Sequence, residues 1–383
     1  MPSILPVIII GAGPAGLAAA AALHQRGVQP LVLEAKHQGR SKVCGGFLNP
    51  AVLSCSQLSP LISHVIAQVP KNEISSLTLS TSRKTKTFAL GSKAKTVCRK
   101  TLDESLWKSV AGAGIKIQGG EPVTAITRDS SHWLVQTTQE SYAADCVILA
   151  TGLNDTLVPS GLSDLKGNNR RVGIQFTLKP EGVFPHSIGL HFGPWGYSGS
   201  CLMGDGLVDC SAVVPVEILR KYGNAEKIWA MMSHTDTFLR QHGSRMQLLN
   251  SQVISRVSPR RRKVQLSQFM TCGDALQFFE PFTGQGIWHA LYSGNLAGHR
   301  MADALDYVPW SQTLRKMESA HREFLRSFSL NLKLAPLLGY PCAAEKIVDA
   351  AMFVPSVVQS MVSCVLVPKT ELSIKNEHVI RTV

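Results

Sequence analysis

Residues 7–16 read Val7-Ile8-Ile9-Ile10-Gly11-Ala12-Gly13-Pro14-Ala15-Gly16, and this stretch decides the fold. Four consecutive apolar residues predict a strand that is buried on both faces. The alanine-rich stretch from Leu17 to Arg26 predicts a helix that ends at Gly27. Residues 30–34 predict a second strand. The chain therefore opens with a strand–helix–strand unit that carries glycines in its first turn.

The glycines of this turn match the GxGxxG pattern of dinucleotide-binding proteins. They permit a tight turn, close approach of a pyrophosphate to the backbone, and close packing of the helix on the strand. The helix N-terminus offers free N–H groups to phosphates. Glu34 ends the second strand, where its carboxylate can accept from ribose hydroxyls and would repel a 2′-phosphate. We expect an adenosine diphosphate moiety to be bound by Gly11, Gly13, Ala15, Gly16 and Glu34.

A second motif lies far along the chain, at Cys272-Gly273-Asp274-Ala275 and at residues 280–287. It resembles the second FAD motif of a flavoprotein superfamily that includes aromatic-ring hydroxylases, geranylgeranyl reductases and flavin-dependent halogenases. By this resemblance Asp274 binds the ribityl chain, and residues 281–286 run beside the isoalloxazine and open a helix. The helix N-terminus would stabilise an anionic reduced flavin. The resemblance implies FAD contacts for Asp274, Pro281, Gly284, Gly286 and Ile287, and a place near the reacting ring for Gln285.

Three shorter features agree with this resemblance. Arg99 resembles the arginine that opens a helix near the flavin in this superfamily. Val123 would lie on the strand beside the adenine. Ala150-Thr151-Gly152 resembles the strand end that packs near FAD. We therefore add Arg99 and Val123 to the expected cofactor-binding residues.

Residues 40–50 form the expected flavin-proximal loop. Within them, Arg40-Ser41-Lys42-Val43-Cys44-Gly45-Gly46-Phe47 resembles the KxCGG segment of geranylgeranyl reductases, where the loop reaches the flavin face. Gly45 and Gly46 would let the backbone approach the ring. Cys44 would shape the pocket or deliver a proton; the alternative is a glycine loop with a buried cysteine. Together with Gln285, these three residues are the expected catalytic group.

The chain also departs from its relatives. The middle DG motif, which is tied to nicotinamide handling in hydroxylases, is not found at residues 151–155. The electron donor is therefore left open as NAD(P)H or another reductant. The WxWxIP element of halogenases and the YxWxFP signature of geranylgeranyl reductases are both missing. In place of the latter stands a hairpin at residues 193–199, where Trp195 and Tyr197 would stack on an apolar or aromatic substrate, or else pack within the sheet.

These features predict an α/β protein with a Rossmann-like FAD-binding domain of the glutathione-reductase-like, hydroxylase type. Alternation and turn glycines over residues 172–214 predict an inserted, mostly antiparallel β substrate domain. Helices are expected near residues 285–303 and 311–329. The expected division is an FAD-binding domain in two parts, a substrate domain between them and a helical C-terminal region, with the bounds 1–160, 161–265, 266–330 and 331–383.

Charge and composition bound the partners and the location. The net charge is +13, yet no basic array interleaved with aromatic residues suggests nucleic acid. Arg260 to Lys263 is expected to be a solvated charge run, with a phosphate, an acidic partner or lipid headgroups as alternatives. Nine scattered cysteines without a CxxC, and the lack of a signal peptide, favour a cytoplasmic protein with reduced thiols. No spacing suggests a metal site. Residues 350–368 carry no charge, so a buried or interfacial helix with peripheral membrane contact is an alternative there.

Three functions are consistent with the sequence. The favoured one is a flavin monooxygenase that hydroxylates an apolar or aromatic substrate, either a small molecule or an aromatic residue of a partner protein, through a C4a-hydroperoxide. The second is a geranylgeranyl-reductase-like enzyme that reduces C=C double bonds of an isoprenoid lipid. The third is an FAD-bound accessory or maturation protein without small-molecule turnover.

Overall fold

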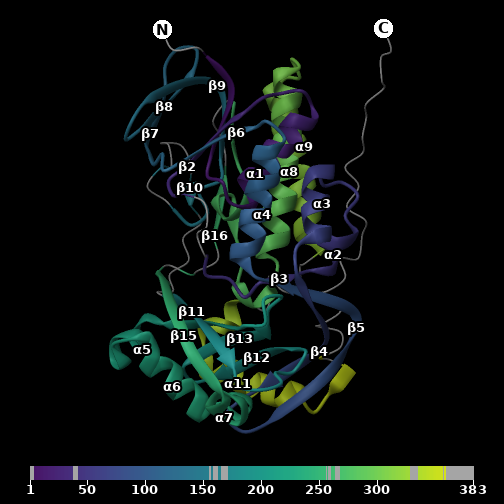
Figure 1. The fold of residues 1–383 in the computed structure, drawn as a ribbon, viewed down its shortest axis with the longest axis vertical. Coiled ribbons are helices and arrows are strands. Elements are labelled where there is room, and N and C mark those ends of the chain that lie inside the picture. Colours follow the sequence, from purple (N-terminus) through teal and green to yellow (C-terminus); the bar gives the residue numbers. More distant parts are fainter. Residues whose placement is uncertain are drawn as a thin grey trace.

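The protein consists of two sheet-based layers stacked along its long axis, as Figure 1 shows. The structure is a computed structural model. It describes residues 4–37, 42–154, 157, 163–164, 171–255, 257, 260–263, 268–327, 335–356 and 358. The first sheet and its helices occupy the upper half of Figure 1, and the second sheet occupies the lower half.

The first sheet has the strand order β6-β2-β1-β9-β8-β7, with β17 paired to β9. Its strands β6, β2, β1, β9 and β17 run parallel, whereas β8 is antiparallel to both of its neighbours, β9 and β7. The four apolar residues that end β1 are buried, as their sequence predicts. The bounds are β1 Leu5–Ile10, β2 Leu31–Glu34, β6 Lys116–Gly119, β7 Val123–Arg128, β8 Trp133–Thr137, β9 Ser141–Leu149 and β17 Phe269–Thr271.

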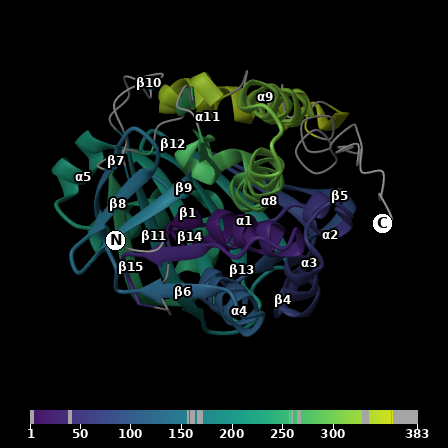
Figure 2. The same ribbon diagram turned by 90° about the horizontal axis from the view of Figure 1, so that it is seen from above.

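The helices α1, α8 and α9 lie in succession beside this sheet, and α4 lies on the other side of α1 (Figure 2). A Cβ built on Gly294 would lie 2.1 Å from the Ala15 carbonyl oxygen, and one on Gly298 would lie 2.4 Å from that of Ala19. The backbones of α1 and α8 therefore touch. The bounds are α1 Pro14–Gln25, α2 Pro50–Ser54, α3 Pro60–Gln68, α4 Arg99–Gly112, α8 Gly286–Leu305 and α9 Trp310–Ser327.

The second sheet has eight strands in the order β15-β11-β14-β13-β12-β4-β5-β3. Every pair in it is antiparallel except β12 with β4. Helices α5 to α7 and α11 flank it in Figure 1. The bounds are β3 Phe47–Leu48, β4 Lys71–Ser80, β5 Thr85–Val97, β11 Arg171–Pro180, β12 Ser187–Gly193, β13 Gly196–Leu202, β14 Val208–Pro215, β15 Met246–Ser255, α5 Val216–Tyr222, α6 Ala225–Thr235, α7 Thr237–His242 and α11 Pro341–Ala351.

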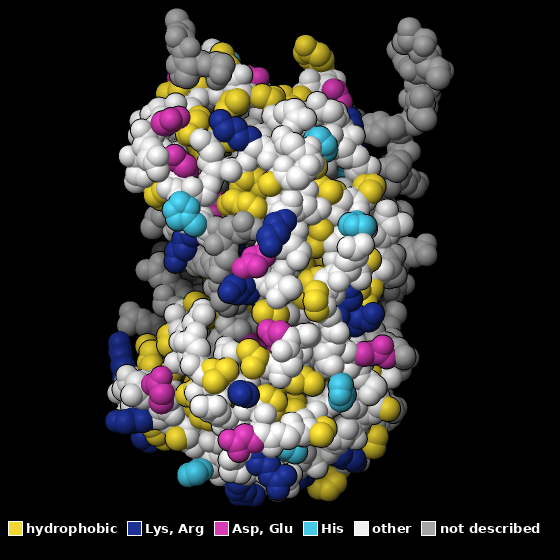
Figure 3. All heavy atoms as spheres, in the orientation of Figure 1, with side chains coloured by type: hydrophobic (Ala, Val, Ile, Leu, Met, Phe, Trp, Pro, Cys, Tyr) yellow, Lys and Arg dark blue, Asp and Glu magenta, His cyan; other side chains and the backbone are white. Residues whose placement is uncertain are grey.

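A small third sheet connects the two layers. Strands β10 (Ser163–Asp164), β16 (Arg260–Lys263) and β18 (Gln277–Phe278) form it, so the arginine-rich run is a paired strand. Lys and Arg side chains also gather along the lower border of the face seen in Figure 3, over α5 and α7.

The α/β fold with a mostly antiparallel second sheet is confirmed, but the domain boundary at residue 160 needs correction. Strands β3, β4 and β5 precede that residue and still belong to the second sheet. β4 pairs with β12, and Leu77, Leu79 and Phe88 share a buried cluster with residues of β12 to β14. This shared core is the physical reason why the segment joins the second sheet. Most of residues 350–368 lie outside the described residues, and no helix within the described part is both long and apolar enough to cross a bilayer.

Candidate functional site

The turn between β1 and α1 accepts glycine alone at two positions. Gly11 has φ +107°, and a Cβ built on it would lie 2.5 Å from the Ala150 carbonyl oxygen. A Cβ on Gly16 would lie 1.8 Å from the Gly11 carbonyl oxygen. The Ala12 N–H donates to Glu34 Oε2 at 2.7 Å. The turn, the N-terminus of α1 and the acidic residue at the end of β2 therefore meet, as the sequence predicts.

A cation lies directly against this turn. A Cβ built on Gly13 would be 2.6 Å from Lys42 Nζ. An ammonium group beside a helix N-terminus creates a strongly positive place, suited to the two negative charges of a pyrophosphate. The donor set therefore fits the diphosphate of FAD, with Lys42 as a contact that we did not expect from the sequence.

Val123 lies where the adenine end is expected. The Glu121 N–H donates to the Glu34 carbonyl oxygen at 2.9 Å, so this segment follows the end of β2 closely. Val123 then begins β7. The structure thus places Val123 two residues after Glu121, which contacts the end of β2 at Glu34.

The second motif packs against the start of α1. A Cβ built on Gly273 would lie 2.8 Å from the Ala15 Cβ, and the Gly273 N–H donates to Ser293 Oγ of α8 at 2.9 Å. Asp274 follows in a single 3₁₀ turn and is partly exposed. Although about 260 residues separate the two motifs in sequence, Asp274 stands beside the glycine turn, which suits a ligand that touches both.

The segment 281–286 is a short turn that opens α8. Gly284 has φ +64°, and Pro281 and Gly286 are exposed, so the loop can be approached from outside. Gln285 is buried; its Nε2 donates to the Thr283 carbonyl oxygen at 3.0 Å, and its Oε1 accepts from Asn49 Nδ2 at 3.2 Å. Its amide therefore holds the loop to the segment before α2. Ile287 is also buried.

A buried ion pair anchors this loop to the second sheet. Arg171 of β11 donates to both carboxylate oxygens of Glu280, at 3.1 and 2.7 Å, and Tyr197 of β13 donates a further hydrogen bond. Burial and the neighbouring Glu280 carboxylate raise the pKa of Tyr197 well above its usual range. Removal of either partner would leave an unpaired buried charge, which lowers the free energy of unfolding, so the two residues must be kept together.

Tyr197 and Trp195 lie in different cores. The ring of Tyr197 lies 6.3 Å from both Phe192 and Phe282. It therefore lies near the loop of residues 281–286, which we call the flavin loop. Trp195 is 2% exposed and packs in the cluster that includes Phe176 on the α6 side of the sheet. Trp195 lies in the turn of the hairpin, before Gly196 with its positive φ, whereas Tyr197 lies in β13. The alternation of a strand therefore does not relate the two residues, and they do not line one surface.

The loop around Cys44 meets the loop before α8. A Cβ built on Gly284 would lie 2.6 Å from the Phe47 ring, so the two loops are in contact. A Cβ built on Gly45 would find no atom within 4 Å, whereas one on Gly46 would lie 2.3 Å from Met203 Cε. One glycine therefore faces open space and the next is packed on the second sheet. Arg40 and Ser41 lie outside the described residues.

Arg99 is the first residue of α4 and stands beside Cys44. Its guanidinium donates to both carboxylate oxygens of Asp103, each at 3.0 Å. Burial lowers the pKa of Arg99, but Asp103 and Cys44 outweigh that effect and raise it overall. The arginine therefore stays charged next to the half-buried thiol of Cys44.

A buried carboxyl group supports the Cys44 loop from behind. The Gln175 amide donates to the Cys44 carbonyl oxygen at 3.2 Å and to Asp209 Oδ2, while Ser211 Oγ donates to Asp209 Oδ1 at 2.7 Å. Burial raises the pKa of Asp209 to about 7. Cys201 Sγ also donates to the Gly45 carbonyl oxygen at 3.3 Å.

Sequence reasoning missed several of these residues. Arg171, Gln175 and Asp209 are single polar residues inside strands, without a spacing that marks them. Their one common signal is a polar side chain at a buried strand position, which becomes visible only once the strand register is known. Asn49, which precedes the proline of α2 and caps that helix, carries a recognisable N-cap pattern.

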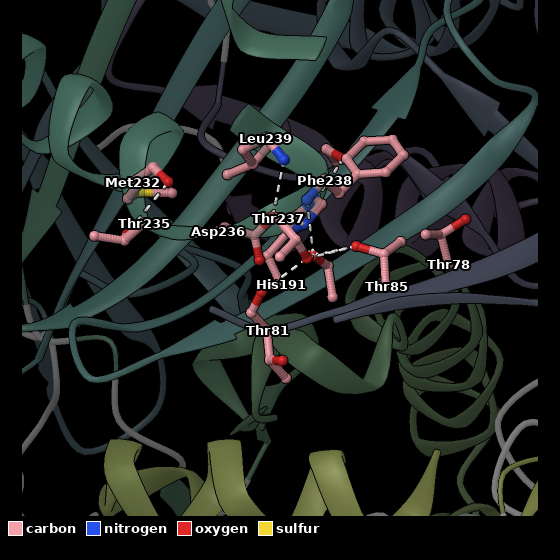
Figure 4. A network of polar contacts seen from close by, with 12 residues as sticks. Thr78, Thr81, Thr85, His191, Met232, Thr235, Asp236, Thr237, Phe238 and Leu239 are labelled. Carbon is pink, nitrogen blue, oxygen red and sulfur yellow. Dashed lines mark hydrogen bonds and ion pairs between the residues drawn. The ribbon is translucent and has the colours of Figure 1, made fainter. Parts of the chain in front are cut away.

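A separate polar network lies on the α7 side of the second sheet (Figure 4). His191 Nε2 lies 2.7 Å from Ser200 Oγ, and its Nδ1 lies 3.3 Å from Asp236 Oδ1. This is the residue set of a hydrolytic triad. All three side chains are buried, and a Cβ on Gly189 would lie 2.5 Å from Ser200 Oγ, so no substrate can reach the hydroxyl. The network holds the sheet to α7.

Comparison with known proteins agrees with this geometry. A family profile described as pyridine nucleotide-disulphide oxidoreductase matches residues 5–171. Over this stretch, which is less than half of the chain, the sequence is similar to that family. It is 24% identical over 361 residues to the digeranylgeranylglycerophospholipid reductase of Thermoplasma volcanium, which covers 86% of this chain and 88% of that protein.

Solved structures of flavin-dependent proteins share the fold. A geranylgeranyl bacteriochlorophyll reductase-like protein from Thermoplasma acidophilum has a TM-score of 0.72 at 18% identity and covers 97% of this chain and 98% of its own. A myxobacterial chondrochloren halogenase has a TM-score of 0.78 at 16% identity, with 94% and 91% covered. The protein therefore has a fold that is common to flavin-dependent reductases and halogenases.

Proposed function

We propose that this protein is an FAD-dependent reductase of carbon–carbon double bonds in an isoprenoid lipid. The observation that carries the proposal is the position of the Cys44–Phe47 loop. It contacts the flavin loop through Phe47 and Gly284, leaves open space over Gly45, and holds a thiol beside Arg99. The similarity to a phospholipid reductase over most of both chains supports the same reaction.

Reduction of an isolated double bond needs a hydride on one carbon and a proton on the other. FAD, once reduced, supplies the hydride. The chain must then supply the proton and a dry, apolar place for the substrate. Cys44 is the group that we assign to the proton. The rings of Phe192 and Tyr197 pack against Phe282 in a buried cluster, which supports the flavin loop from below.

Hydroxylation, which the sequence favoured, remains the second candidate. The similarity of the fold to flavin-dependent halogenases supports it, because those enzymes share this architecture. The electron donor, NAD(P)H or another reductant, is equally a proposal. A protein substrate or a maturation role would require a partner.

One experiment separates the two reactions. The holoprotein is photoreduced without oxygen and mixed with a geranylgeranyl lipid. Reoxidation of the flavin together with a product that has gained two hydrogens per double bond supports the reductase. A transient near-UV absorbance band on admission of air, lengthened by a substrate that gains one oxygen atom, would overturn it.

Two variants test the site assignment. Cys44→Ala should retain FAD and lose most of the double-bond reduction, whereas Cys44→Ser should keep the loop in place and recover little of it. Asp274→Ala should lose FAD on purification. Unchanged turnover in Cys44→Ala would reduce Cys44 to a packing residue, and stoichiometric flavin in Asp274→Ala would refute the ribityl assignment.

A further inference from the structure

Helix α11 and the residues next to its two ends expose large apolar side chains, which we call the apolar stripe. Tyr340 at the N-cap, Ile347 within the helix and Val354 just beyond its end are 71%, 48% and 46% exposed. Ala343 and Ala350 lie between them and are also exposed. Exposed large apolar side chains that gather within fifteen residues, Tyr340, Ile347, Phe353 and Val354, are typical of a surface that contacts a partner.

The opposite side of α11 is firmly held. Ala344 and Met352 pack in one core cluster with Phe192, and Tyr197 belongs to the same cluster. Lys86 Nζ donates to the Met352 carbonyl oxygen at 2.8 Å. The exposed stripe is therefore not the inward side of a helix that has come loose.

The acidic residues of α11 are turned away from the stripe. Ser82 Oγ and its N–H donate to Glu345 Oε1, and Thr81 Oγ1 donates to Asp349 Oδ1 at 2.7 Å. Thr81 also accepts from Thr237 at its carbonyl oxygen, so the turn that holds α11 continues into the network of Figure 4. Both carboxylates are thereby committed to the turn between β4 and β5.

The charges left beside the stripe are positive. Lys346 is exposed on the helix, and the Arg83 side chain is 71% exposed on the neighbouring turn, with its Nε 3.9 Å from Asp349 Oδ2. Lys84 Nζ lies 3.6 Å from the centroid of the Phe353 ring, and that ring is 77% exposed. An aromatic side chain with a lysine over its face, next to an aliphatic stripe, is the arrangement found at the boundary between lipid headgroups and acyl chains.

We propose that α11 docks this protein onto an anionic lipid bilayer, with the Tyr340–Ile347–Val354 stripe and Phe353 entering the headgroup region. The cations beside them would contact lipid phosphates. The sequence carries no charged residue between Asp349 and Lys369, which is compatible with the same boundary, and the net charge of +13 favours an anionic surface. This inference does not depend on which reaction the flavin performs.

The test is flotation of the full-length holoprotein with vesicles of phosphatidylcholine, with and without phosphatidylglycerol. Binding should require phosphatidylglycerol and weaken with salt. Ile347→Glu and Phe353→Glu should each weaken binding about tenfold, because each removes apolar burial of the order of 1.4 kcal/mol. Leu249→Glu is the matched control, since Leu249 on β15 is also 48% exposed and should float as the parent does.

The same preparations distinguish the alternative occupant. Sedimentation velocity without lipid should show one species for the parent and for Ile347→Glu. A dimer that Ile347→Glu abolishes would assign the stripe to a second copy of the chain and overturn the proposal. Flotation that is absent in the parent, or equal in Ile347→Glu and Leu249→Glu, would also overturn it. Bound FAD and thermal unfolding report that each variant is folded.

Discussion

The adenosine end and the flavin end of the expected cofactor site are held together by different kinds of contact. At the adenosine end, backbone groups and small residues of one short segment meet, and added side-chain atoms have nowhere to go. At the flavin end, the loop before α8 is held by Arg171, Glu280 and Tyr197, which come from three separate segments. The first end is sensitive to volume and the second to charge. Variants that add volume or remove charge should therefore affect the two ends differently.

The largest effect is expected from added volume at the adenosine end. Gly11→Ala places a methyl group against the Ala150 carbonyl oxygen in a left-handed conformation, and FAD should bind about a hundredfold more weakly. Flavin content and a fluorescence titration measure this. Gly27→Ala is the control, because Gly27 also has positive φ but open space around it. Equal FAD affinity in the two variants would contradict the assignment of the turn.

Removal of one charge tests the flavin end. Glu280→Gln leaves the Arg171 guanidinium buried without its partner and should lower the free energy of unfolding by about 3–5 kcal/mol. Urea unfolding followed by tryptophan fluorescence measures the loss. Arg171→Met combined with Glu280→Gln should recover part of it, since no isolated charge remains. If the double variant is no more stable than Glu280→Gln, the pair does not act as a unit.

Asp209 gives the flavin end a pH dependence. The folded state binds a proton more tightly than the unfolded state, because the pKa of Asp209 is raised to about 7. Its contribution to stability is therefore full below pH 4 and is lost as the pH rises through 7, by about 4 kcal/mol. Asp209→Asn should gain stability relative to the parent at pH 8 but not at pH 4. A difference that does not change with pH would contradict this.

The stability of the contact between α8 and α9, which carry His289 and His321, has the opposite pH dependence. His289 and His321 are buried with their Nε2 atoms 3.3 Å apart, and burial lowers both pKa values, that of His321 to about 4. The unfolded state takes up a proton near pH 6.5, so the free energy of unfolding falls as the pH drops, by about 3 kcal/mol between pH 6.5 and 4 for His321. His321→Asn should flatten this fall, whereas His64→Asn, at an exposed position, should not. Equal acid sensitivity in both would rule out His321 as the source.

This difference between the two ends also explains what the sequence could predict. The βαβ unit, the helix that starts at Arg99 and the helix after the flavin loop follow from local patterns, and the structure has them. The second sheet was predicted only in part, since β4 and β5 join it across more than a hundred residues. Trp195 and Tyr197 were paired because they are neighbours in sequence, yet they pack in different cores.

The contact between α1 and α8 has a consequence for how this protein can change. Their backbones touch at Gly294 and Gly298, and the two helices begin at opposite ends of the cofactor site. Because the two helices are packed directly on each other, they fix the distance between the expected diphosphate site and the expected flavin site. Under the proposed function, changes in the Cys44 loop and the second sheet would alter the substrate and leave the cofactor contacts in place. Libraries aimed at new substrates should leave this helix pair untouched and vary the residues that face it.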